Sequence, residues 1–193
     1  MASLVFMFVP LSLMLFNIIF LLPHPSMAME SHPTCNSCIR QASSQQPSSD
    51  DCGPSGTLAC NDGQNFPTYT CSPPVMPPTS AKLTHNDFSK GGEGGAESEC
   101  DNQFHKNTEK IVALSTGWFS GRCNMTIIIT AVSNGMSVEA KVVDQCDSQN
   151  GCDDEHGFLP PCENNIVDGS SAVWEALSLD TEPGSAEVTW STA

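Results

Sequence analysis

The chain has 193 residues, a formal net charge of −15 and ten cysteines. A chain this acidic repels phosphate backbones and anionic lipid headgroups, so nucleic-acid binding and roles at a membrane surface are disfavoured. The charge is concentrated late in the sequence, because the stretch from Val142 to the end has eleven acidic residues and no Lys or Arg. A basic partner or a cation would be complementary to that half.

Residues 1–28 are predicted to be a signal peptide. Residues 4–22 are almost wholly apolar, and Ser26 and Ala28 are the small residues that signal peptidase accepts. An uncleaved anchor is the alternative, although Pro10 and Asn17 interrupt the apolar run. Cleavage after Ala28 predicts a secreted, extracellular protein with no membrane segment in its mature form.

All ten cysteines follow this leader, and an even number in an exported chain predicts disulfides. Five precede Pro77 and five follow it, so complete pairing requires an odd number of bridges between the two halves. The spacing leaves the connectivity open, and zinc is the alternative for the first pair, without a matching second pair of ligands. The expected half-cystines are Cys35, Cys38, Cys52, Cys60, Cys71, Cys100, Cys123, Cys146, Cys152 and Cys162.

Residues 29–79 are rich in Ser, Pro, Gln and Cys and show no helical or alternating period. Such a segment is expected to be a loop-built arm that depends on disulfides for its order, ending in the linker PPVMPPTS. Residues 80–193 form the predicted folded domain.

Short β-branched runs dominate the first part of this domain. Residues 111–115 (IVALS) and 126–132 (TIIITAV) are predicted strands, and residues 136–143 form a return strand. Asn134 and Gly135, between the last two, are typical of a tight hairpin turn.

A short helix is predicted over residues 168–179, capped by Asp168, and residues 187–190 give a last strand. Several short strands, one short helix and disulfides in place of a larger core indicate an all-β fold, namely a compact β-barrel.

Several motifs together resemble the kiwellins, or ripening-related proteins, of plants. They are CGPSGTLAC, PTYTCSPPV, AKLTHNDFSKGGEGGAESECDN, IVALSTGWFSGRC, VVDQCDSQNGCDDEH, NNIVDGSSAVWEAL and the terminal VTWS. The resemblance implies a six-stranded double-psi β-barrel, related to barwin-like proteins and to the first domain of expansins. It also implies secretion to the apoplast or cell wall and a part in ripening or defence, in which some members bind and inhibit enzymes secreted by microbes.

In that group a strand ending in V-x-D-x-C pairs with a later x-D-x-S junction, and the resemblance places Asp144, Asp168 and Ser170 at these positions. Two interpretations of the aspartates are open. As structural groups, Asp168 would cap the helix and Asp144 would accept backbone N–H groups, which would lower both pKa values. As a catalytic pair acting on wall polysaccharide, one would need a raised pKa. Val167 stands where related wall hydrolases have an aromatic residue. The sequence favours the structural interpretation.

Asp153, Asp154, Glu155 and His156 lie together between two cysteines. Calcium binding is one possibility, but the spacing is not that of an EF-hand, and a solvent-facing loop is favoured. Because loops on a rigid scaffold often carry recognition, this cluster is the first candidate for contacting a positively charged partner.

Trp118 and Phe119 are either an aromatic platform for a sugar or a protein, or part of the barrel core. His85 and His105 have no adjacent nucleophile, which disfavours a catalytic triad. Asn124 opens a glycosylation sequon, with occupancy left open.

The leading hypothesis is a secreted monomer that binds other extracellular proteins, possible targets being microbial enzymes, and makes at most a weak contact with wall polysaccharide, without catalysis, cofactor or metal. The alternative is a wall-acting enzyme or loosening factor that uses Asp144 and Asp168. A third hypothesis is an abundant storage or structural protein.

Overall fold

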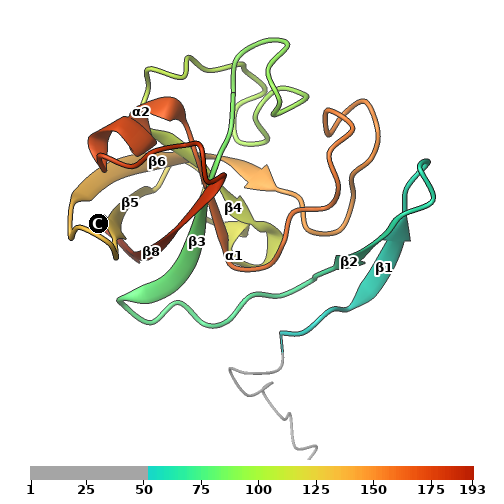
Figure 1. The fold of residues 1–193 in the computed structure, drawn as a ribbon, viewed down its shortest axis with the longest axis horizontal. Coiled ribbons are helices and arrows are strands. Elements are labelled where there is room, and N and C mark those ends of the chain that lie inside the picture. The colour runs from blue at the N-terminus through green and yellow to red at the C-terminus, as the bar shows by residue number, and fades with distance from the viewer. Residues whose placement is uncertain (1–51) are drawn as a thin grey trace, which may run out of the picture. The chain divides into compact units, whose positions relative to one another are not determined.

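The computed structural model describes residues 52–193, so the predicted signal peptide, Cys35 and Cys38 lie outside the described residues. Figure 1 shows a closed barrel and, beside it, a two-stranded hairpin. The barrel strands are β3 (Thr79–His85), β4 (Ile111–Ser115), β5 (Thr126–Ala131), β6 (Ser137–Cys146), β7 (Ile166–Gly169) and β8 (Ser185–Thr192). Two short helices accompany them, α1 (Thr116–Phe119) and α2 (Ser171–Ala176), of which the sequence predicts only the second.

The strands follow the order β3-β7-β4-β6-β5-β8 around the barrel. β3 and β7 are parallel, as are β4 and β6, and the other neighbours are antiparallel. Because closure pairs every strand on both sides, none of the six presents a free edge. The prediction of a six-stranded double-psi β-barrel is confirmed.

The two faces of β4 belong to different hydrophobic clusters. Val112 and Leu114 point into the barrel and join its main core. Ala113 and Ile111 alternate with them and lie on the outer face, in a smaller cluster with Phe88 from the segment after β3. The outer wall of the barrel is therefore covered at this point by the segment between β3 and β4.

The predicted hairpin after β5 is confirmed, with β5 and β6 antiparallel. Gly135 has a φ of +72°, which glycine adopts without strain, and Asn134 accepts a hydrogen bond from the backbone N–H of Met136.

The predicted helix cap is wrong. Asp168 lies within β7, paired with Thr84 of β3, and α2 begins only at Ser171. The residue before the helix, Ser170, makes no side-chain cap; its hydroxyl donates instead to the carbonyl of Glu109. The strand therefore continues two residues further than the sequence pattern indicates.

The described part of the arm is more ordered than the sequence predicts. β1 (Gly56–Ala59) and β2 (Asn65–Thr68) form an antiparallel hairpin. At its turn, Asp62 accepts a hydrogen bond from the backbone N–H of Gln64. Short, exposed strands of this kind lack the apolar alternation that would mark them in the sequence.

Four disulfides join the eight cysteines of residues 52–193: Cys52–Cys71, Cys60–Cys152, Cys100–Cys123 and Cys146–Cys162. The second of these links the arm to a loop of the barrel domain, as the odd number of cysteines in each half predicts. Such bridges are typical of proteins that fold in an oxidising compartment. In the same residues, the structure contains no helix long and apolar enough to cross a bilayer.

Candidate functional site

Four residues form one row across four neighbouring strands on the outer face of the barrel. Thr84 of β3 pairs with Asp168 of β7, Asp168 pairs with Ala113 of β4, and Ala113 pairs with Asp144 of β6. Residues opposite one another in a sheet point to the same face. The two carboxyl groups therefore share a surface, and the short side chain of Ala113 leaves space between them.

A β-bulge turns Asp144 toward this face. Val112 pairs with Val142 and Ala113 pairs with Asp144, so Val143 is an extra residue in β6. Without the extra residue, simple alternation would turn Asp144 inward like Val142, which is fully buried in the apolar core. Bulges commonly re-aim side chains next to functional sites, and this one brings the second carboxyl group into the row.

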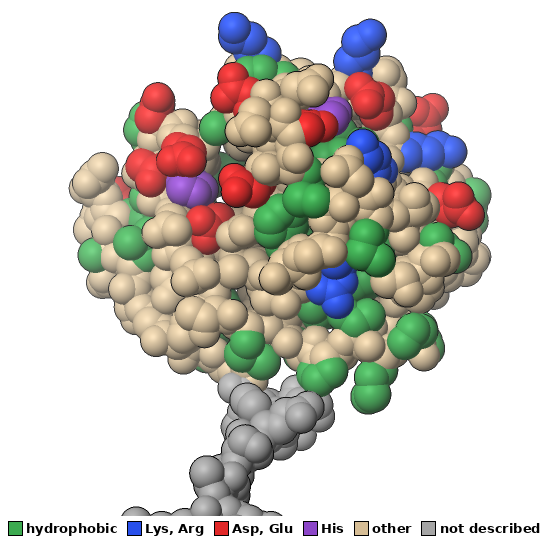
Figure 2. All heavy atoms as spheres, turned by 180° about the vertical axis from the view of Figure 1, so that it is seen from behind, with side chains coloured by type: hydrophobic (Ala, Val, Ile, Leu, Met, Phe, Trp, Pro, Cys, Tyr) green, Lys and Arg blue, Asp and Glu red, His purple; other side chains and the backbone are tan. Residues whose placement is uncertain are grey.

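Above the row lies a cavity of about 430 Å³. Its floor includes the four residues of the row, and its walls come from the segment after β3 and from the loop 147–163. The residues that line its walls include His85, Glu93, His156, Leu159, Pro160 and Pro161. On the face drawn in Figure 2, acidic side chains and histidines gather around a hollow in which hydrophobic side chains are visible. A cavity of this size is at the small end of ligand sites.

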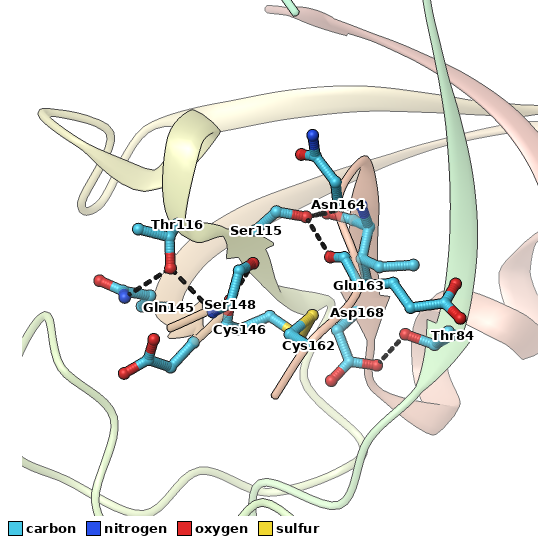
Figure 3. Close-up of a disulfide and its surroundings, with 12 residues drawn as sticks. Thr84, Ser115, Thr116, Gln145, Cys146, Ser148, Cys162, Glu163, Asn164 and Asp168 are labelled. Carbon is cyan, nitrogen blue, oxygen red and sulfur yellow. Dashed lines mark hydrogen bonds between the residues drawn. A yellow bond between two sulfur atoms is a disulfide. The ribbon is translucent and has the colours of Figure 1, made fainter. Parts of the chain in front are cut away.

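Asp168 has one hydrogen-bonded and one free carboxyl oxygen. The hydroxyl of Thr84 donates to Oδ1 at 2.5 Å, and within residues 52–193 no donor reaches Oδ2. Figure 3 shows the two side chains pointing toward each other near the Cys146–Cys162 disulfide, with the second oxygen of Asp168 directed away from Thr84. Burial raises the pKa of Asp168 to about 6; the Thr84 hydroxyl opposes this rise, and the negative charges of Asp144 and Glu93 add to it.

Asp144 has a similar arrangement. Its Oδ1 accepts the backbone N–H groups of Glu99 and Gln145, both at 2.8 Å, as the structural interpretation predicts. Burial nevertheless raises the pKa of Asp144 to about 6, because the two N–H donors do not fully offset the loss of water. The prediction that both pKa values are lowered is therefore wrong. The described ion pairs include neither aspartate.

The two loops that wall the cavity touch each other through their backbones. The N–H of Ala96 donates to the carbonyl of Glu155 at 3.0 Å. A Cβ on Gly95 would lie 2.2 Å from that same carbonyl oxygen, and one on Gly157 would lie 2.7 Å from the carbonyl oxygen of Glu93. Glycine is required at both positions for the loops to approach this closely.

The acidic cluster of the sequence lies at the edge of the cavity. Asp153, Asp154 and Glu155 are exposed, whereas His156 is partly buried and lines the cavity. Although burial opposes charge on the ring, Asp153 and Asp147 raise the pKa of His156 by hydrogen bonding and by their negative charge. In the described chain, no group of three or more His, Cys, Asp or Glu side chains is arranged to hold a metal ion.

Trp118 does not form the aromatic platform, because its ring is only 1% exposed and belongs to the barrel core. Its indole N–H donates to the carbonyl of Pro73, and its ring meets that of Trp190 edge to face at 5.2 Å. Phe119 is partly buried and packs against the same core. The core interpretation of this pair is correct.

Two apolar side chains that the sequence analysis does not single out are exposed instead. Phe158 is 68% exposed and Leu159 is 49% exposed, in the loop between Cys152 and Cys162. Their signal in the sequence is the presence of two large apolar residues in an otherwise polar segment between two cysteines.

Asn124 is exposed and precedes β5, with a φ of +63°. The position leaves its side chain accessible, and whether it carries a glycan stays a prediction.

Comparison with known proteins places the chain in a family. The sequence model described as Kiwellin-1 matches residues 9–193. The chain belongs to the kiwellin family. The resemblance found in the sequence motifs is thereby confirmed.

Two curated relatives illustrate the match. The protein named Kiwellin from Actinidia chinensis var. chinensis is 58% identical over 163 residues, which cover 83% of this chain and 76% of the relative. Ripening-related protein grip22 from Vitis vinifera is 62% identical over 144 residues, which cover 74% of this chain and 65% of the relative. Neither name states a catalytic activity. Among solved structures, the apo form of an expansin from Clavibacter michiganensis aligns with 24% identity and a TM-score of 0.44, over 60% of this chain and 50% of the expansin chain.

Proposed function

We propose that this kiwellin-family protein is secreted and binds other extracellular proteins in plant ripening or defence, with enzymes secreted by microbes as targets, and that it catalyses no reaction itself. The observation that carries the proposal is the loop between Cys152 and Cys162. It presents the exposed Phe158 and Leu159 beside acidic side chains. Apolar anchors surrounded by polar groups are typical of protein interfaces.

The loop is held at both ends. Cys152 is bridged to Cys60 of the arm, and Cys162 is bridged to Cys146 at the end of β6. A loop fixed in this way loses less conformational entropy when a partner binds, so more of its contact energy contributes to affinity. The negative charge around it would also select a basic partner and accelerate the encounter.

Affinity capture with the purified protein from extracellular fluid of infected tissue tests this proposal. We expect a discrete protein partner whose enzymatic activity falls when the kiwellin-family protein is added. Phe158→Ser combined with Leu159→Ser should abolish capture. Val132→Ser is the matched control, because Val132 is 64% exposed but lies directly after β5 and outside this loop, and it should capture normally. Equal capture by all three proteins would contradict the proposal.

A wall-acting enzyme remains a second candidate, because Asp144 and Asp168 have pKa values raised to about 6 and line one cavity. Their strands are both neighbours of β4, so their Cα atoms are about 10 Å apart, given a spacing of about 4.8 Å between strands. However, no Trp, Tyr or Phe is among the residues that line this cavity in the described chain. A sugar ring would therefore lack the aromatic surface on which it usually stacks.

Wall glucans incubated with wild type and with Asp168→Asn separate the two candidates. Release of soluble sugars by wild type but not by the folded variant would support the enzyme. We expect no release by either protein.

A further inference from the structure

Two carboxyl groups in the cavity over the strand row are only partly hydrogen-bonded by the protein. Asp144 and Asp168 each have one oxygen that accepts hydrogen bonds from the protein, and for the other oxygen residues 52–193 supply no donor. Both free oxygens belong to residues that line the same cavity. Both residues are partly buried, and removing a carboxylate from water without a counter-ion is unfavourable, so a cation or a proton would stabilise this site.

The surrounding charges favour a cation. Five acidic side chains and one lysine line the cavity, and Lys82 is already paired with Glu163 at 2.6 Å. His156 is likewise engaged, since its ring nitrogens face Asp147 and Asp153. Asp144, Asp168 and Glu93 therefore remain without a cationic partner among the described side chains.

The shape and the walls favour one kind of cation. The carboxyl groups stand on either side of Ala113, so a ligand that satisfies both must bridge them with several donors. Guanidinium is planar, has five N–H donors and is weakly hydrated, whereas ammonium is a compact and strongly hydrated point charge. Leu159, Pro160 and Pro161 supply apolar surface along which an aliphatic stem can lie.

We infer that the cavity above Thr84, Asp168, Ala113 and Asp144 receives one arginine side chain of the partner protein, with its guanidinium group between the two carboxyl groups. This inference rests on the proposed function, and it names the chemistry by which the partner is recognised. The exposed Phe158 and Leu159 lie in the loop that supplies one cavity wall, so the same partner surface can contact both.

Binding of such a group depends on pH, because a protonated carboxyl group no longer attracts it. With pKa values of about 6, roughly one tenth of each carboxyl group is ionised at pH 5, so affinity should fall about tenfold for each group that the cation contacts. The other titratable groups that face the pair are Lys82, His85, Glu93, Glu99, His105, Asp147, His156 and Glu163. Protonation of His156, whose pKa is raised by Asp153 and Asp147, adds positive charge to the cavity wall and acts in the same direction.

The test is an NMR titration of the full secreted chain with small probes, following the backbone amides of Glu99 and Gln145, which donate to Asp144. The probes are N-acetyl-arginine methylamide, the corresponding lysine amide, and the citrulline amide, which is a neutral analogue of arginine. We expect the arginine probe to bind at pH 7.5, at least tenfold more tightly than the citrulline probe, and to bind at least tenfold more weakly at pH 5.

Asp168→Asn should weaken binding of the arginine probe at least tenfold, because it removes one negative charge. The fold should persist, since the amide has the same shape and its oxygen can still accept a hydrogen bond from the Thr84 hydroxyl. Asp180→Asn is the matched control, because Asp180 is exposed and is not among the lining residues, and it should bind as wild type does. Equal binding of the arginine and citrulline probes, tighter binding of the lysine probe, or binding of cellohexaose at the same amides would overturn the inference.

Capture experiments separate this inference from the proposed function. If Asp168→Asn captures the partner as well as wild type does while the Phe158 and Leu159 variant does not, the arginine inference fails and the proposed function stands. If the arginine probe binds but no partner is captured, the proposed function fails and the cavity retains only a small-molecule specificity.

Discussion

At the scale of single residues, Asp168 is part of a barrel strand, and its burial makes the ionised form of its carboxyl group unfavourable. It lies in the middle of the barrel wall, between Thr84 and Ala113, yet burial raises its pKa from 3.8 to about 6. In the folded protein the carboxyl group therefore holds its proton to a higher pH than in the unfolded chain. The contribution of Asp168 to folded stability is consequently greatest in acid and falls as the pH rises from about 4 to about 6.

Replacing Asp168 with Asn should remove this dependence. A pKa shift of about two units corresponds to about 3 kcal/mol at 1.36 kcal/mol per unit. We therefore expect Asp168→Asn to raise the free energy of unfolding by about 2–3 kcal/mol at pH 7.5 and to leave it nearly unchanged at pH 4. Urea unfolding at both pH values measures this difference.

Asp180→Asn is the control, since Asp180 is exposed and its carboxyl oxygen only accepts the backbone N–H of Glu182. Its stability should match wild type at both pH values. A variant at Asp168 that is less stable than wild type at pH 7.5 would show that the ionised form is the one that the fold favours.

At the scale of the elements, the site depends on how two loops meet over the outer face of the barrel. Gly95 has a φ of +77° and lies against the carbonyl of Glu155. Gly91 has a similar φ of +80°, but a Cβ there would meet nothing within 4 Å. The same substitution at the two positions therefore separates backbone strain from contact between the loops.

Gly91→Ala should cost about 1 kcal/mol of stability through the left-handed backbone alone. Gly95→Ala should cost about 1–3 kcal/mol more, because the added methyl group pushes the two loops apart. Hydrogen exchange at the amide of Ala96, which donates to Glu155, should accelerate strongly in Gly95→Ala and little in Gly91→Ala. Equal exchange in both variants would mean that the loops do not depend on this contact.

Sequence patterns predicted the elements that local periodicity defines and missed those that depend on distant contacts. The β5–β6 hairpin follows from its apolar runs and from Asn134-Gly135, and the barrel follows from the kiwellin motifs. The same motifs place Asp144 and Asp168 at the strand ends where the structure has them. Their raised pKa values were not predicted, because burial here comes from segments that close over the strands after folding.

Other parts of the site left little trace in the sequence. The bulge at Val143 is invisible to a period-two pattern, since Val142 and Val143 both read as buried strand residues. The exposure of Phe158 and Leu159 depends on the two disulfides that hold their loop, and the sequence does not reveal which cysteines pair. The cluster of Asp153, Asp154, Glu155 and His156 did point to the site, because His156 lines the cavity.

At the scale of the whole molecule, one disulfide connects the arm to the loop between Cys152 and Cys162. Cys60 and Cys152 are 92 residues apart in sequence, so their bridge closes the longest loop of the four described. In the chain-entropy view, a loop of this length gives the largest stabilisation through the unfolded state.

Replacing both Cys60 and Cys152 with Ser should lower the free energy of unfolding by about 2–5 kcal/mol. We expect the barrel to keep its near-UV circular dichroism, while the amides of the β1–β2 hairpin exchange faster. Capture of the partner should weaken, because the loop that carries Phe158 loses one of its two fixed ends. Unchanged capture would show that Cys146–Cys162 alone positions the loop.

Residues 73–78 connect the arm to β3 along the backbone, and Cys60–Cys152 joins the arm to the barrel domain a second time. A protease that cuts between Ser72 and Pro78 would therefore separate the backbone without releasing either piece. The two pieces of the nicked protein would stay covalently joined and would separate only when a reductant opens Cys60–Cys152.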